Sequence, residues 1–83
     1  MIEPSVSPCA MIEYIAKAIV DAKGEVFIEE YEDGDETVIE LEVAEADLGK
    51  IIGRSGRVAR ALRNLLSAAG SKLGKRYALE IIE

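Results

Sequence analysis

The segment Gly53-Arg54-Ser55-Gly56 has the residue types and spacing of an anion-binding turn. Glycine lacks a β-carbon and permits backbone conformations that other residues obstruct. A turn of this kind between two helices leaves amides exposed beside the positive end of the second helix dipole, and that arrangement holds phosphate groups. Arg57 follows the turn directly, and Lys50 lies one helical turn ahead of it. The segment therefore predicts a site for the phosphates of a larger ligand.

The charge distribution supports this prediction, although the net charge of −6 does not. Affinity for phosphates comes largely from Lys and Arg. Residues 1–48 carry 14 acidic and 2 basic side chains, whereas residues 49–83 carry 8 basic and 2 acidic ones. A simple helix linker would not explain why bases gather around the turn, so we favour a ligand site. Taken singly, Arg60 and Arg63 are explained equally well as solubilising charges on an exposed helix face.

Side chains for nucleophilic or metal chemistry are scarce. The chain has no histidine, and Cys9 is its only cysteine, which excludes a zinc site and a histidine-dependent triad. Residues 70–75 are one residue short of a P-loop. The acidic residues at 29–36 fail the EF-hand spacing because Thr37 replaces a ligand position. We expect no enzyme activity, no metal and no cofactor, and we interpret the acidic run as a solvated edge that repels nucleic acid.

The first half of the chain predicts one helix and a hairpin. Residues 1–7 show no periodicity and are expected to form a flexible tail, and Ser7-Pro8 is a typical helix start. Residues 25–32 and 37–43 alternate in polarity around the turn Asp33-Gly34-Asp35, as paired strands do. The helix preceding them is expected to end near Gly24. Its apolar positions at helical spacing are Met11, Ile15, Ala18, Ile19 and Ala22.

The second half predicts two helices and a strand. Asp47 is expected to cap a short helix that ends near Gly53, and a longer helix should run from Arg57 to about Ala69. Gly70 and Gly74 should bracket a loop before a strand at 76–82. The order α-β-β-α-α-β predicts an α+β fold, with the helices packed on one face of a mixed three-stranded sheet. The last strand then lies parallel to its neighbour through a right-handed crossover.

Residues 49–63, which include Ile52-Gly53-Arg54-Ser55-Gly56, resemble the KH family of RNA-binding domains, and the element order resembles the type II arrangement. Residues 49–63 also resemble the small bacterial stand-alone KH proteins of the KhpA type. The resemblance covers roughly residues 10–83 and implies a single KH domain at 8–83. It also implies a groove for about four unpaired nucleotides, clamped at the loop. Ala59 departs from the family, where many members have a larger aliphatic residue.

The resemblance implies roles for individual positions. Gly53 and Gly56 would shape the clamp, and Arg54 and Ser55 would meet phosphates. The candidates for the groove wall are Ile51, Ile52 and Val58. The full set of predicted RNA-binding residues is Lys50, Ile51, Ile52, Gly53, Arg54, Ser55, Gly56, Arg57, Val58 and Arg60.

We therefore expect a non-enzymatic protein that binds single-stranded RNA with little sequence preference, as a general RNA chaperone or post-transcriptional regulator. One small groove makes few contacts, so we expect a homodimer or a heterodimer with another KH-containing protein. No segment approaches the roughly 20 apolar residues needed to cross a bilayer, and we expect a cytoplasmic protein. The alternative is a protein-interaction module that keeps the KH fold and uses its acidic N-terminal half as the binding surface.

Overall fold

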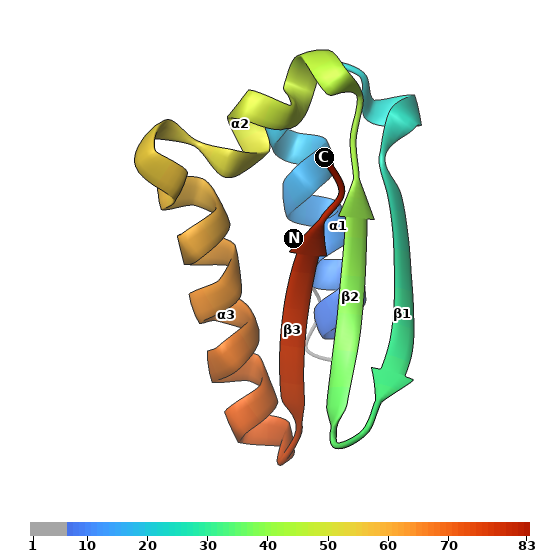
Figure 1. The fold of residues 1–83 in the computed structure, drawn as a ribbon, viewed down its shortest axis with the longest axis vertical. Helices are drawn as coiled ribbons and strands as arrows, with labels where there is room; N and C mark the ends of the chain where they lie inside the picture. The colour runs from blue at the N-terminus through green and yellow to red at the C-terminus, as the bar shows by residue number, and fades with distance from the viewer. Residues whose placement is uncertain (1–6) are drawn as a thin grey trace.

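The computed structural model describes residues 7–83, which fold as three helices over one sheet (Figure 1). Helix α1 spans Pro8–Ile19, α2 spans Leu48–Ile52 and α3 spans Arg57–Leu73. Strands β1, β2 and β3 span Phe27–Asp33, Glu36–Glu42 and Arg76–Ile81. The predicted tail at 1–7 lies outside the described residues, except for its last residue. None of the helices in the described part of the chain has the length and apolar character to cross a membrane.

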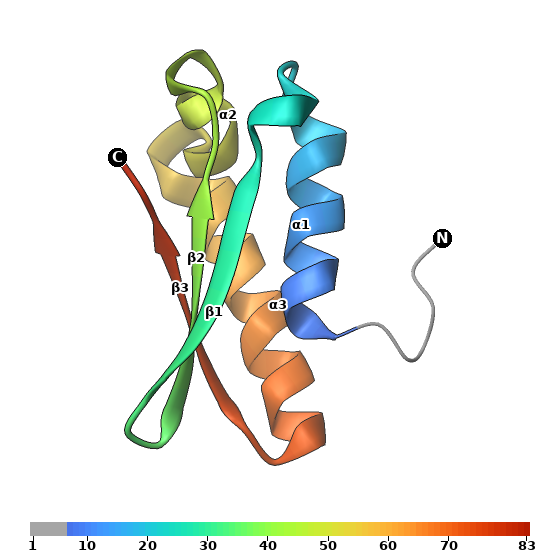
Figure 2. The same ribbon diagram turned by 90° about the vertical axis from the view of Figure 1, so that its right-hand side faces the viewer.

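The sheet has the order β1-β2-β3. Strands β1 and β2 pair antiparallel, with Phe27 opposite Glu42, and β3 lies parallel to β2 on its other side. The helices pack on one face of this sheet and the opposite face is uncovered (Figure 2). The predicted α+β class, element order and mixed sheet are confirmed.

Helix α1 begins as predicted, because the Ser7 hydroxyl accepts a hydrogen bond from the Ala10 amide at 3.2 Å. Three of its predicted apolar positions, Met11, Ile15 and Ile19, are partly buried against the core, whereas Ala18 is exposed. The buried positions of the helix are Pro8, Ile12 and Ala16, and Val20 directly after it is buried as well. The helix also ends earlier than predicted, at Ile19.

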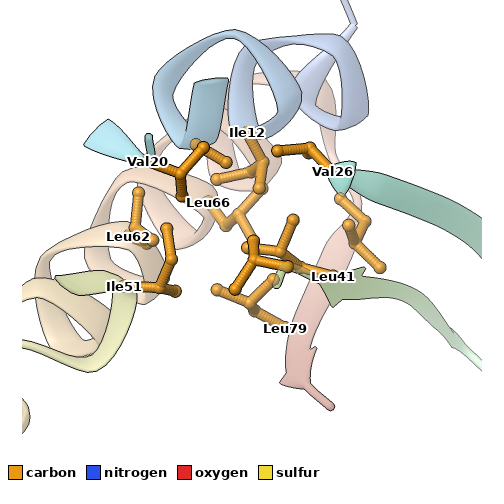
Figure 3. Packing of buried hydrophobic residues seen from close by; sticks show 11 residues of the cluster. Ile12, Val20, Val26, Leu41, Ile51, Leu62, Leu66 and Leu79 are labelled. Carbon is orange, nitrogen blue, oxygen red and sulfur yellow. The ribbon is translucent and has the colours of Figure 1, made fainter. Parts of the chain in front are cut away.

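The core lies between α1, α3 and the sheet. Figure 3 shows side chains from all three layers meeting there, and Ile51 brings the short helix α2 into the same cluster. Burial of this kind stabilises by about 25 cal/mol for each Å² of apolar surface removed from water. The labelled members of the cluster are Ile12, Val20, Val26, Leu41, Ile51, Leu62, Leu66 and Leu79.

Helix α3 continues through Gly70, which was expected to lie in a loop. A β-carbon at Gly70 would lie 2.5 Å from the carbonyl oxygen of Lys75, so glycine lets β3 begin against the end of the helix. The Lys75 amide donates to the Gly70 carbonyl at 2.8 Å, and Gly74 ends the helix with φ of 71°. Only Gly74 and Lys75 connect α3 to β3.

Candidate nucleic-acid interface

Gly53 ends α2 in a backbone conformation that only glycine adopts readily, with φ of 77° and ψ of 169°. Its amide donates to the Gly49 carbonyl at 2.8 Å and closes the helix. A β-carbon at this position would lie 2.5 Å from Val58 Cγ2 and 2.8 Å from the Val58 amide nitrogen. Both the backbone conformation and the contact with α3 therefore require glycine here.

The next three residues, Arg54–Gly56, form a tight hydrogen-bonded turn whose backbone is not helical at Ser55. Ser55 has φ of 56° and Gly56 has φ of 75°, so both lie in the left-handed region. Within the turn the Gly56 amide donates to the Gly53 carbonyl at 3.1 Å, and the Arg57 amide donates to the Arg54 carbonyl. The sequence predicted exposed amides throughout the loop. The structure uses those of Gly53, Gly56 and Arg57 internally, which leaves the amides of Arg54 and Ser55 as candidates for a ligand.

A hollow of about 410 Å³ lies beside this loop, between the start of α3 and the end of β3. Ala59 is almost fully buried in its wall, so the small side chain that departs from the family leaves the hollow open. The lining mixes aliphatic and charged groups. Its residues are Ile52, Gly56, Ala59, Arg60, Arg63, Ile81 and Glu83.

Two arginines of α3 are held at this hollow by main-chain carbonyls. Arg60 Nη2 donates to the Ser55 carbonyl at 3.3 Å, which places its guanidinium against the loop. Arg63 Nη2 donates to the Leu79 carbonyl at 3.2 Å and so bridges α3 to β3. Arg63 was not among the predicted site residues, yet it lines the hollow as Arg60 does.

Asp47 does not cap α2 as predicted. Its buried carboxylate accepts hydrogen bonds from the Ala22 amide at 3.0 Å and the Asp21 amide at 3.2 Å, just after the end of α1. Lys50 Nζ lies 3.3 Å from Asp47 Oδ1 and also pairs with Asp21. The amides of Ala22 and Asp21, followed by Lys50, lower the pKa of Asp47 below its ordinary value. The carboxylate thus ties α2, and the loop after it, to the end of α1.

This pairing bears on the predicted role of Lys50. The hydrogen bond to Asp21 raises the pKa of Lys50, and Asp47 adds to the effect. The Lys50 side chain is about half exposed and its ammonium is paired with two carboxylates, so a phosphate contact requires it to share or exchange these partners.

The structure separates the three predicted groove-wall residues. Ile51 has no exposed surface and packs in the core, so it lies outside the groove. Val58 packs against the core and beneath Gly53, and Ile52 alone of the three lines the hollow.

Residues from the end of β3 complete the hollow, and sequence reasoning did not name them. Ile81 and Glu83 face the start of α3 across it. Their position beside the start of α3 could have been predicted from the order of the elements. A helix and a strand joined by a short turn run in opposite directions, so the end of β3 must return to the start of α3.

The chain was compared with known proteins. A family model described as the KH domain of KhpA and KhpB matches residues 10–81. The RNA-binding protein KhpA of Aquifex aeolicus is 52% identical over 73 residues, which cover 88% of this chain and 92% of that protein. Proteins of the same name from Treponema pallidum and Borreliella burgdorferi are 49% and 47% identical to this chain. Each matched segment covers 88% of this chain, and it covers 91% of the Treponema protein and 89% of the Borreliella protein.

Proposed function

The chain belongs to the KhpA/KhpB KH-domain family, and on this premise we propose that it is an RNA-binding protein that holds single-stranded RNA by its backbone at residues 53–56. The observation that carries the proposal is the loop itself, in which Gly53, Ser55 and Gly56 all have positive φ at the start of a 17-residue helix. Such a turn, at the positive end of a long helix dipole, favours a phosphate.

The proposed RNA contacts around the loop are of two kinds: charged contacts to phosphates and contacts of the bases with the hollow. Arg54 and Arg57 are exposed beside the turn and add two positive charges to the helix dipole. The hollow between α3 and β3 would receive the bases of unpaired nucleotides, with Ile52 as its apolar contact and Arg60 at its edge. Phosphate contacts fix position without reading sequence, so little sequence preference is expected.

We further propose that this protein works in association with a second KH domain, from another copy or from a different protein. A single hollow of about 410 Å³ offers few contacts, and linking two sites raises effective concentration. The exposed leucines Leu65 and Leu73 of α3 give apolar surface for such an association. A cytoplasmic role as an RNA chaperone or post-transcriptional regulator is the function that fits weak, non-selective binding.

The test reverses the loop charge with Arg54→Asp and Ser55→Asp together. Aspartates at these positions place like charge against phosphate, so affinity for a labelled unstructured RNA octamer should fall at least tenfold. Circular dichroism checks that the fold persists. Ser71→Asp with Lys72→Asp, at the other end of α3, makes a similar change of charge away from the loop and should weaken binding less than threefold.

Titration against salt gives a second measurement on the same proteins. Each phosphate contact on a single strand contributes about −0.7 to the slope of log affinity against log salt, so the loop variant should have the shallower slope. Unchanged RNA affinity and crosslinking in a folded loop variant would contradict the proposal. The alternative of a protein-interaction module would then stand, with the acidic N-terminal half as its binding surface.

A further inference from the structure

The face of the sheet that turns away from the helices has its own chemical character (Figure 2). Side chains alternate along each strand, and the pairing register places successive outward positions side by side across the sheet. We call this the outer face. Its outward positions are Phe27, Glu29, Tyr31 and Asp33 of β1, Glu36, Val38, Glu40 and Glu42 of β2, and Arg76, Ala78 and Glu80 of β3 with the following Ile82.

A row of glutamates crosses the outer face. Glu29 pairs with Glu40 in the antiparallel register, and Glu40 pairs with Glu80 in the parallel one. Like charges directly opposite each other destabilise a sheet. Within residues 7–83, none of the ion pairs joins these three glutamates to a base. A cationic ligand would relieve their mutual repulsion.

Apolar side chains stand beside this row. Phe27 is 59% exposed and Ile82 is 41% exposed. They border a hollow of about 200 Å³ whose other walls are Glu29, Glu40 and Glu42. The hollow therefore has two apolar walls, Phe27 and Ile82, and three walls that carry carboxylates.

We propose that the outer face binds a lysine- and arginine-rich segment of a partner protein, with one large apolar side chain of that segment in the hollow between Phe27 and Ile82. The charges of the face and of such a segment are complementary, and complementary charge steers association. The same charge repels RNA and anionic lipid surfaces. Within the described part of the chain, no group of acidic or cysteine side chains is arranged to hold a metal ion.

The dimensions of the face indicate a peptide segment as the occupant. Six residues of strand extend about 20 Å, and three strands spaced about 4.8 Å apart span about 10 Å. This area accepts one extended segment of about six residues. Interfaces of this size are at the weak end of specific recognition, and we expect dissociation constants of roughly 10 to 500 μM at low salt.

A second copy of this chain fits the face less well. Its exposed bases lie in two places: at the loop, with Arg54 and Arg57, which is proposed to hold RNA, and around the far end of α3, with Lys72, Lys75 and Arg76. Docking that loop on the outer face would block the RNA site. It would also be a head-to-tail contact, which forms open chains unless the rotation closes a ring. A separate basic protein leaves both surfaces free to act together.

The experiment uses a fluorescein-labelled nine-residue peptide of alternating lysine and arginine with one central phenylalanine. Fluorescence anisotropy gives its affinity, and amide chemical shifts in ¹⁵N-labelled protein locate it. Shifts should concentrate on β1, β2 and β3 and spare residues 53–56. A peptide with central glycine should bind about threefold to tenfold more weakly, and Phe27→Ala should remove that difference.

Charge on the face is tested by Glu29→Gln, Glu40→Gln and Glu80→Gln together. Peptide affinity should fall at least tenfold, while RNA affinity should not fall. The matched control, Glu25→Gln, Asp35→Asn and Glu45→Gln, removes the same charge from exposed sites outside the face and should weaken the peptide less than threefold. Removing repulsion should not unfold the protein, and Glu40→Gln alone gives a milder variant for the same measurement.

Three results would overturn the proposal. The control variant could lose as much peptide affinity as the variant with glutamine at 29, 40 and 80, which would mean that the peptide is attracted by the net charge of the protein and not by the outer face. Shift changes could map to the loop and α3 in place of the sheet. Sedimentation could show a self-associated protein that dissociates when the face is neutralised, which would make a second copy the occupant. Peptide binding that persists in the Arg54→Asp and Ser55→Asp variant separates this surface from the RNA site.

Discussion

The loop between α2 and α3 and the hairpin between β1 and β2 both reverse the chain at a glycine with positive φ. At Gly34 in the hairpin, a β-carbon would meet no atom within 4 Å, and the surrounding side chains are acidic and exposed. At Gly53 in the loop, a β-carbon would meet the backbone and side chain of Val58, and the surrounding charge is basic. The hairpin thus needs only the glycine conformation, whereas the loop is also held by what packs beneath it. A turn that is fixed in this way can present a constant geometry to a ligand.

The largest expected effect comes from replacing the two turn glycines with alanine. Gly53→Ala should lower the free energy of unfolding by about 3 kcal/mol or more, because it combines a strained conformation with a steric clash. Gly34→Ala should cost about 1 kcal/mol, because only the left-handed conformation is penalised. Urea unfolding measures both.

RNA affinity should follow the same order. It should fall in Gly53→Ala under conditions where the protein remains folded, and it should stay within twofold of the original in Gly34→Ala. Equal destabilisation by the two substitutions would mean that the contact with Val58 does not hold the loop.

Asp47 contrasts with the carboxylates of the hairpin. The Ala22 and Asp21 amides and Lys50 lower the pKa of Asp47, so the folded state favours its charged form over the unfolded chain, where the pKa is near the ordinary value of 3.8. The resulting stability is present above that value and is lost as the pH falls through the lower pKa of the folded state.

Asp47→Asn should therefore lower the melting temperature by several degrees at pH 7, with a gap to the original protein that narrows below about pH 4. Glu40→Gln, in the hairpin, should instead raise the melting temperature at pH 7, because it removes a charge that lies opposite Glu29 and Glu80. Melting curves from pH 3 to pH 7 measure both. A gap for Asp47→Asn that does not change with pH would contradict the role given to its charge.

The smallest effect is expected from the glutamates of β1, which we expect to repel RNA and so orient it toward the loop. Neutralising Glu29, Glu30 and Glu32 with glutamine should raise nonspecific RNA affinity about twofold to fivefold at low salt, and the gain should vanish at high salt. Glutamine at position 32 keeps an acceptor for the Thr37 hydroxyl, which donates to Glu32 at 2.9 Å. Unchanged affinity would show that the acidic strand has no such effect.

Local signals were sufficient to predict the element order and the two turns. The alternation around Gly34 and the pair of glycines at 53 and 56 depend on neighbouring residues only, and the structure has a hairpin and a helix-loop-helix at those places. The resemblance to a known family added the expectation of a groove beside the loop. Individual residue roles at that groove remain predictions.

Long-range contacts were not predictable in the same way. Gly70 stays inside α3 because the carbonyl of Lys75 approaches it, and Asp47 turns away from its own helix to the amides after α1. The contact between Arg63 and the Leu79 carbonyl joins residues 16 positions apart. Residue type and spacing do not specify such partners, because they depend on how the elements pack.

The short connection between α3 and β3 has a consequence for how RNA would enter the proposed groove. The two walls of the hollow are consecutive elements joined by Gly74 and Lys75, and Arg63 ties them together near the loop. The proposed groove therefore belongs to one preorganised unit, and we expect its width to change little on binding. The entropy lost in the complex falls mainly on the RNA, which must unstack and extend, so RNA that is already unstructured should associate fastest.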